Sequence, residues 1–373
     1  MTSMQFSERR TIWPTIRPYV MVFDGTLALI VFLILSVSAF TMFSAGMDAP
    51  GRFEDHMRNT LIAFVVMWIA AIMPPQLLMR FAVPIYTVGV ALLIAVAMFG
   101  LVKKGARRWV NVGVVIQPSE IMKIAVPMML AWYFQKREGM IQWHHFIVGG
   151  VILAIPGVLI MRQPDLGTAL LVLAAGFYVI FFAGLPWKIL ATLTAIGLAS
   201  LPVAWSMLHD YQRQRVMTLI DPTTDPLGTG FHIIQSMIAI GSGGIWGKGW
   251  TNGTQTHLEF IPERTSDFLF AAYSEEFGLI GNIVLLVLYL LLIGRGLLIA
   301  ANAPTLFSRL LAGAITMIFF TYAFVNMGMV SGILPVVGVP LPFMSYGGTA
   351  FMTLGLGIGM LMSIQRHRKL VQS

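Results

Sequence analysis

Long apolar runs recur along the whole chain, separated by short polar connections. About 20 apolar residues cross a bilayer as a helix, and helices satisfy their own backbone hydrogen bonds in lipid. On this measure the pattern predicts about ten spans, near residues 19–45, 57–73, 81–101, 117–134, 146–162, 166–185, 188–208, 268–294, 306–331 and 347–364. The predicted fold class is an all-α polytopic membrane protein. The sequence shows no internal repeat or shift in composition, so residues 1–373 are predicted to form a single membrane domain.

A long polar interval, residues 209–267, separates the seventh and eighth predicted spans. A passive connector between two helices needs far fewer residues, so we expect the chemistry to lie in this loop. Its glycine-rich stretch 241–249 does not follow a predicted strand and matches neither nucleotide-binding pattern, which favours flexible packing close to the membrane. Residues 332–348 contain three prolines and predict a second irregular segment, either an outer loop or a re-entrant one.

Composition supports a membrane protein and narrows the partners. The chain is 57% hydrophobic and 11% charged, about half the charge of a typical soluble domain. Its net charge of +8 favours a membrane surface over nucleic acid, because no soluble basic face is available. The absence of cysteine excludes disulfides, thiolate metal sites and cysteine nucleophiles.

The basic residues predict an orientation. An even number of spans places both termini on one side, and the short connections there are basic. They carry Arg9, Arg10, Arg17, Arg80, Lys136, Arg137, Lys188, Arg295, Arg309, Arg366, Arg368 and Lys369. A raw count of lysines and arginines ties between the two sides, so the orientation rests on the termini and short loops. By the positive-inside rule both termini are cytoplasmic, and residues 209–267 face outward.

Several ionisable residues fall in or beside predicted spans, where charge is costly and often functional. Glu120 and Lys123 share a helix face, either as a structural ion pair or as the lining of a cavity for a charged headgroup. Asp165 could cap the next helix, bind a cation or pair with an arginine. Glu275 and Glu276 favour structural pairing.

Asp267 stands where the polar interval meets the eighth span. It could be an N-cap carboxylate, or a group that accepts a proton or holds a divalent cation at the mouth of a cavity. Basic residues on the same outer face match phosphate oxygens, so they predict an anionic ligand such as a pyrophosphate, although headgroup contacts would also explain some of them. They are Arg107, Arg108, Arg213, Arg215, Lys248 and Arg264.

Six ordered motifs across nearly the whole chain resemble the SEDS (shape, elongation, division and sporulation) family of bacterial cell-wall polymerases, and its elongation branch more than its division branch. They are GARRWVNVGVVIQPSEIMKIAVP (105–127), RQPDLGTALL (162–171), DYQRQRV (210–216), DPLGTGFHIIQSMIAIGSGG (225–244), PERTSDFLFAAYSEEFG (262–278) and GILPVVGVPLPFMSYGG (332–348). One departure is Thr265-Ser266 before Asp267, where the family usually has His-Thr.

The resemblance implies a peptidoglycan glycosyltransferase that joins lipid II units on the outer face of the bacterial inner membrane and releases undecaprenyl pyrophosphate. It implies that Asp267 is the essential carboxylate and that Glu120, Lys123 and Asp165 belong to the central cavity. Trp109, Arg107, Arg108, Arg213, Arg215 and Lys248 complete the predicted substrate site. We expect a divalent cation, Mg²⁺ or Mn²⁺, with Asp267 and Asp165 as candidate ligands, and no organic cofactor. The expected partners are a class B penicillin-binding protein, penicillin-binding protein 2, and other elongation-complex proteins.

Two alternatives stay open at this stage. A lipid II flippase would use the same cavity around Glu120 and Lys123 but would need no carboxylate at its outer mouth. A scaffold that only recruits a transpeptidase would leave the buried charges and the arginines unexplained. The missing repeat symmetry, which many transporters carry, favours the enzyme.

Overall fold

The computed structural model describes residues 22–103, 106–111, 115–163, 165–207, 210–224, 228–258, 260–261 and 263–368. A long helix lies at every predicted span: α2 (Gly25–Ala45), α3 (Arg52–Ile72), α4 (Pro75–Phe99), α5 (Pro118–Gln135), α6 (Trp143–Met161), α7 (Leu166–Phe182), α8 (Trp187–Met207), α12 (Leu269–Ala301), α13 (Leu306–Val330) and α14 (Gly348–His367). The helical membrane fold is therefore confirmed. Among the described residues, six of these helices are long and apolar enough to cross a membrane. The number of spans, like the single domain, stays a prediction.

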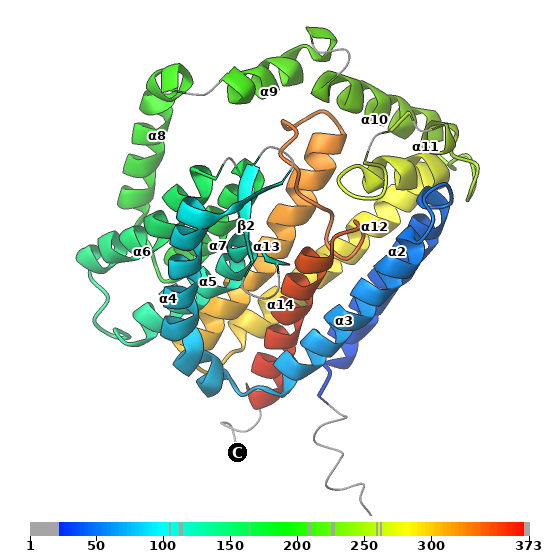
Figure 1. Ribbon diagram of the computed structural model, residues 1–373. Coiled ribbons are helices and arrows are strands. Elements are labelled where there is room, and N and C mark those ends of the chain that lie inside the picture. Colours follow the sequence, from blue (N-terminus) through cyan, green and yellow to red (C-terminus); the bar gives the residue numbers. More distant parts are fainter. Residues whose placement is uncertain are drawn as a thin grey trace, which may run out of the picture.

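The helices surround α13, which runs through the middle of the bundle and packs against α5, α7 and α12 (Figure 1). On one side α14 packs along α3, and α2 lies against α12. In contrast, α8 stands apart at the edge of the bundle, and most of its side chains between residues 187 and 203 are exposed (Figure 1). The core thus lies around α13, and the inner faces of its neighbours meet there.

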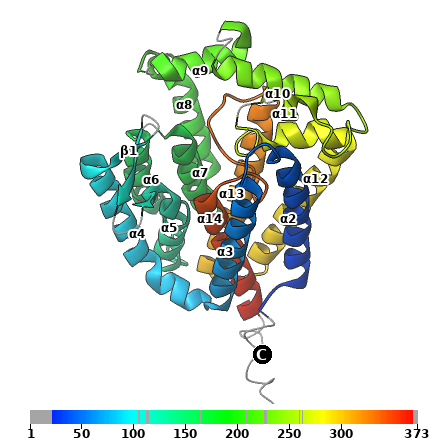
Figure 2. The same cartoon turned by 45° about the vertical axis from the view of Figure 1, so that its right-hand side comes forward.

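The two ends of the bundle differ. The start of α2 and the end of α14 lie at one end, and the helices of the polar interval lie at the other (Figures 1 and 2). This separation agrees with the predicted grouping of both termini opposite residues 209–267. We call the end that carries the polar interval the outer end.

The polar interval is mostly helical, not the long loop that its composition predicts. It forms α9 (Asp210–Ile220), a short 3-10 helix (Pro222–Thr224), α10 (Thr229–Gly243) and α11 (Thr254–His257). In α10, Ile233, Ser236 and Ala239 are buried at intervals of three residues, so one face of the helix packs inward. Glycines and prolines lie where these helices end. Because the interval contains many of them, its sequence does not show the helical pattern of the segments between them.

A small antiparallel sheet, also absent from the prediction, lies between α4 and α5. It consists of β1 (Leu101–Lys103), β2 (Ala106–Asn111) and β3 (Val115–Ile116), in the order β1-β2-β3. Trp109 pairs with Leu101, and Val110 pairs with Ile116. Strands of two to six residues are too short to give a recognisable alternation in sequence. The sheet carries Arg108 and Trp109 at the outer end of the bundle.

Candidate active site

Residues 331–347, between α13 and α14, form an irregular segment that packs inside the protein. Val339, Leu341 and Met344 are buried. The side-chain amide of Asn326 donates to the carbonyl oxygen of Val339 at 2.7 Å. The hydroxyl of Tyr289 donates to the carbonyl oxygen of Pro342, also at 2.7 Å. Side chains thus satisfy backbone groups that have no helical partner, as the membrane interior requires. The predicted irregular segment facing protein is confirmed.

Asp267 lies half-buried beside this segment. The N-cap of α12 is Phe268, so the helix begins one residue later than the capping interpretation of Asp267 predicts. The amide of Asn326 holds the carbonyl oxygen of Asp267 at 2.9 Å. A Cβ atom added to Gly338 would lie 3.4 Å from Oδ2 of Asp267. Its carboxylate is therefore placed against Gly338, where the positive φ of 72° favours glycine.

Asp165 approaches the same segment from the other side. Its carboxylate caps α7, accepting from the amide of Thr168 at 3.2 Å, and it accepts from Nε2 of Gln117 at 3.1 Å. The guanidinium of Arg108 lies 3.8 Å from its Oδ1. Both the predicted helix cap and the predicted arginine partner are present. Gly167, one residue into α7, packs so tightly on residue 337 that an added Cβ would lie 2.5 Å from that carbonyl oxygen.

Glu120 and Lys123 form the predicted ion pair on one face of α5. Nζ of Lys123 lies 2.6 Å from Oε1 of Glu120 and donates to the hydroxyl of Tyr322 at 2.6 Å. The hydroxyl of Thr353 lies 3.4 Å from the other oxygen of Glu120. The pair joins α5 to α13 and α14 across the middle of the bundle.

Glu120 also lines a cavity of about 550 Å³ between α3, α4, α5 and α14. Gln117 and Thr353 are among its few polar residues, and the rest of its wall is apolar. Phe81, 45% exposed, also lines it, so the cavity reaches the exposed side of the bundle beside α4. An elongated apolar space with a polar end suits an amphiphile. Glu120 thus belongs both to the ion pair and to the wall of this cavity, whereas Lys123 does not line it.

The other predicted basic residues have different surroundings. Arg213 donates to the carbonyl oxygens of Trp205 and Ser206 at 3.1 and 2.7 Å, which completes the end of α8. Lys248 contacts Glu275 at 2.7 Å. Arg264, which is buried, contacts the carbonyl oxygen of Ala45 at 3.1 Å and Asp48 at 3.3 Å. Arg107 and Arg215 belong to β2 and α9, but their side chains lie outside the described residues. Of the predicted basic residues, Arg108 is thus the one that the described contacts place beside Asp165.

The predicted structural pairing of Glu275 and Glu276 is confirmed. Lys248 contacts Glu275, and the hydroxyl of Ser44 donates to Glu276. Both carboxylates are buried within α12.

Sequence analysis missed Gln117, Tyr322 and Asn326. Each is polar and lies within or next to a predicted span, and in lipid that position is itself a signal of function or tight packing.

The carboxylates permit a particular kind of metal site. Among the described residues, no three histidine, aspartate or glutamate side chains are grouped to hold a metal ion. Mg²⁺, however, often binds through one or two carboxylates, with water and substrate phosphates filling the other positions. Asp267 or Asp165 fits such a site, which a pyrophosphate would complete. The predicted Mg²⁺ or Mn²⁺ stays a prediction.

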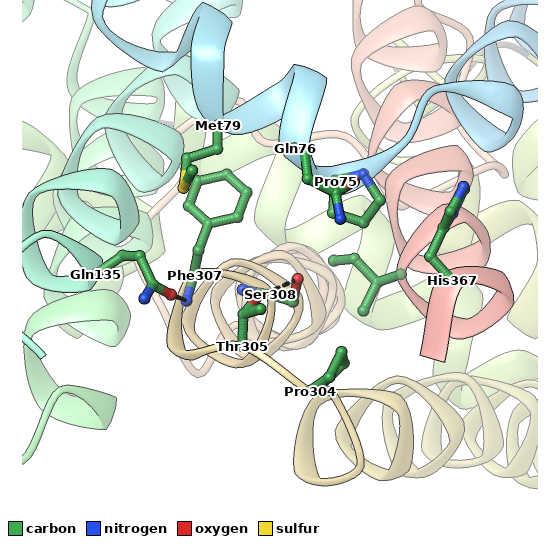
Figure 3. Close-up of a pocket in the computed structure, with 10 residues that line it drawn as sticks. Pro75, Gln76, Met79, Gln135, Pro304, Thr305, Phe307, Ser308 and His367 are labelled. Carbon is green, nitrogen blue, oxygen red and sulfur yellow. Dashed lines mark hydrogen bonds between the residues drawn. The ribbon is translucent and has the colours of Figure 1, made fainter. Parts of the chain in front are cut away.

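A second, smaller cavity of about 160 Å³ lies at the opposite end of the bundle, where α4 begins and α14 ends (Figure 3). Gln135, Phe307 and His367 contribute to its wall. Oε1 of Gln135 accepts from the amide of Phe307 at 2.7 Å, which closes one side. None of the predicted site residues lines this cavity.

Residues 17–370 match the family model of the FtsW/RodA/SpoVE cell cycle proteins. The chain belongs to this family, the SEDS proteins. It is 47% identical to the peptidoglycan glycosyltransferase MrdB of Escherichia coli strain K12, over 97% of both chains. It is 30% identical to the peptidoglycan glycosyltransferase RodA of Treponema pallidum, covering 93% of this chain and 98% of that one.

Solved SEDS structures have the same fold. The rod shape-determining protein RodA of Thermus thermophilus, at 27% identity, superposes with a TM-score of 0.70 and covers 93% of this chain and 98% of that one. A chain from a structure of a peptidoglycan synthase complex that coordinates polymerization and crosslinking, at 29% identity, superposes with a TM-score of 0.80. It covers 93% of this chain and 99% of that one. The sequence matches and the structural matches thus indicate the same family and the same multi-pass membrane fold.

Proposed function

We propose that this protein is a peptidoglycan glycosyltransferase that polymerises lipid II during cell elongation. One observation carries the proposal: an apolar cavity of about 550 Å³ lies next to the carboxylates of Asp165 and Asp267, which flank residues 337–339. Glu120 and Gln117 form the polar end of this cavity. Gln117 makes the connection, because it lines the cavity and donates to Asp165. This arrangement suits a prenyl chain in the cavity, with its pyrophosphate and sugar near Asp165 and Asp267. The 47% identity to a peptidoglycan glycosyltransferase supports the same activity.

In the proposed reaction Asp267 is the general base. Its carboxylate accepts the proton of the 4-hydroxyl of the acceptor sugar as that oxygen attacks the anomeric carbon of the donor. A new glycosidic C–O bond forms, the bond from the anomeric carbon to the pyrophosphate oxygen breaks, and the configuration inverts. A positioned general base contributes about 10²–10⁴-fold to such a step.

The leaving group is undecaprenyl pyrophosphate, on which negative charge grows as the bond breaks. Arg108 is placed to offset this charge, and Asp165 together with Gln117 orients that end of the site. Fixed charges of this kind often give the largest contribution to catalysis. A divalent cation bound at Asp267 or Asp165 would supply further charge neutralisation to the pyrophosphate.

The proposal includes a location and a partner. The protein would lie in the bacterial inner membrane with both termini cytoplasmic and Asp267 facing the periplasm. Its likeness to a chain of a peptidoglycan synthase complex supports work beside a crosslinking enzyme. We propose a class B penicillin-binding protein, penicillin-binding protein 2, together with other proteins of the elongation complex.

Polymerisation of purified lipid II by the purified full-length protein tests the proposal. Asp267→Asn is expected to lower the rate at least about 100-fold, because the proton acceptor is lost while the shape is kept. Asp221→Asn is the matched control, since this exposed acid of the same interval bonds to the turn that follows it through Thr223. More than a tenth of the activity in folded Asp267→Asn would show that Asp267 is not the base. Lipid II movement across liposome membranes without glycan chains would instead favour a flippase.

A further inference from the structure

Helix α12, which follows Asp267, is broken near its outer end. At Gly278 the backbone angles are φ 64° and ψ −160°, so the helix divides into an outer part, residues 269–277, and an inner part, residues 279–301. Backbone groups that lose their helical partners at the break are paired with residues 244–249 instead. The amides of Lys248 and Gly249 donate to the carbonyls of Glu275 and Glu276, both at 3.0 Å. This glycine-rich stretch is thus packed on α12 by regular backbone hydrogen bonds.

The side chain of Glu275 fixes the same place more firmly. Its carboxylate has an exposed fraction of 0% and accepts from Lys248 Nζ (2.7 Å), Gln255 N (2.9 Å), Thr256 Oγ1 (3.1 Å), Thr256 N (3.2 Å) and Thr254 Oγ1 (3.2 Å). A buried carboxylate is stable only with such a set of donors. Glu275 therefore ties the outer part of α12 both to α11 and to Lys248.

The outer part of α12 is short, and the Glu275 contacts add to the bonds that set its orientation. These are the backbone bonds to residues 244–249 and the bonds of Tyr273 and Ser274 across the break. Glycine adopts positive φ readily, and the break at Gly278 leaves the outer part without a continuous helical connection to the inner part. Its first end is held where Asn326 binds the carbonyl of Asp267, and its other end is held at Glu275. Eight residues separate the two points, about 12 Å along a helix. Loss of the second contact would let the carboxylate of Asp267 change its angle.

We propose that Lys248 and Glu275 are positioning residues for the transfer reaction, whose ion pair holds the outer part of α12 and, through it, the carboxylate of Asp267. The sequence predicted Lys248 as a substrate contact, and this inference gives it another role. The inference rests on the function proposed above, in which Asp267 is the base. Neither residue touches the reacting atoms in this proposal.

The same helix offers a matched control. Asp24, the N-cap of α2, binds Arg295 on the inner part of α12 through two bonds of 3.0 and 2.6 Å. This ion pair also ties α12 to a neighbouring segment, but it lies beyond the break at Gly278. Its loss would weaken the fold without releasing the outer part.

The test compares Glu275→Gln, Lys248→Met, the double variant, Asp24→Asn and Asp267→Asn in the full-length protein in lipid nanodiscs. The measurements are the thermal unfolding midpoint and kcat and KM for lipid II, well below that midpoint. Glu275→Gln and Lys248→Met are expected to lower kcat about 10- to 100-fold, because a small misplacement of a reacting group has effects of this size. Their KM should stay within about twofold, since binding contacts remain. The double variant should lose no more than the worse single variant, and Asp24→Asn should lower the midpoint alone.

Two outcomes would overturn the inference and leave the proposed function standing. One is an equal fall in kcat for Asp24→Asn and for the outer variants at equal loss of midpoint. The other is a rise in KM alone for Lys248→Met, which would make Lys248 a substrate contact. If Glu275→Gln does not fold, Lys248→Met decides, because its side chain is 26% exposed and Glu275 keeps its four other donors. Full activity of Asp267→Asn would overturn the role of Asp267 as the base, and this inference with it.

Discussion

Lys123 is 3% exposed in the middle of the bundle, where an ammonium group needs acceptors for its hydrogens. Two of these acceptors, Glu120 and Tyr322, come from positions about 200 residues apart. The i,i+3 spacing within α5 was enough to predict the first. The second could not be predicted, because nothing in a local pattern tells which helix packs against α5. Residue chemistry thus revealed the charged pair, and packing supplied the group that completes it.

Tyr322→Phe tests the contribution of the second acceptor of Lys123 to stability. The hydroxyl binds a charged group, so its loss is expected to cost about 1.5–3 kcal/mol, against about 0.5–1.5 kcal/mol for a neutral hydrogen bond. Tyr178→Phe is the matched control, since its hydroxyl bonds the hydroxyl of Thr321 at 2.8 Å on the same helix α13. Unfolding midpoints of both variants in one detergent give the comparison. An equal or larger loss for Tyr178→Phe would contradict the importance given to the Lys123 contact.

At the scale of elements, residues 268–294 were predicted as one continuous span, and the break within α12 was not predicted. Gly278 looks like any glycine in a membrane helix, because the reason for its positive φ lies in residues 244–249. A Cβ atom added there would lie 2.3 Å from the amide nitrogen of Gly247. Apolar runs alone were enough to locate α2 to α8 and α12 to α14. The short sheet and helices α9 and α10 were not predicted, because their sequence patterns are short or interrupted by glycine.

Gly278→Ala is expected to destabilise the protein by at least about 2 kcal/mol, because both the positive φ and the close backbone contact oppose a side chain. Gly294→Ala in the same helix has nothing within 4 Å of the added atom. It is expected to be neutral or stabilising by up to about 1 kcal/mol, because alanine favours a helix over glycine. Thermal unfolding of the two variants measures the difference, and similar midpoints would mean that α12 can straighten without cost.

For the whole molecule, the arrangement of α3, α4, α5 and α14 around the large cavity decides what kind of substrate the site accepts. No single motif predicted that cavity, because its wall comes from four helices that carry ordinary apolar residues. The polar end was predictable from Glu120, and the apolar length was not. Together they indicate a lipid with a charged head.

A larger side chain in the cavity wall tests whether the apolar part of the cavity holds the lipid chain. Leu356→Trp, in the cavity wall, is expected to raise KM for lipid II about tenfold, equivalent to about 1.4 kcal/mol of lost binding. A soluble analogue with a short prenyl chain should bind the variant as it binds the unchanged protein. Leu290→Trp, on an exposed face of α12, is the control and should leave both substrates unaffected. An equal rise in KM for both substrates would mean that the cavity does not hold the chain.

The two ion pairs on α12, one at each side of its break, also fix the position of the helix along its own axis relative to its neighbours. Lys248 binds it near the outer end, and Arg295 binds Asp24 near the other. A slide of one helical turn, about 5.4 Å, would separate both pairs at once. Membrane helices commonly adjust to bilayer thickness by tilting or kinking. This helix is held against its neighbours at both sides of the break, so Asp267 should keep its position relative to the rest of the site in thin and thick bilayers alike.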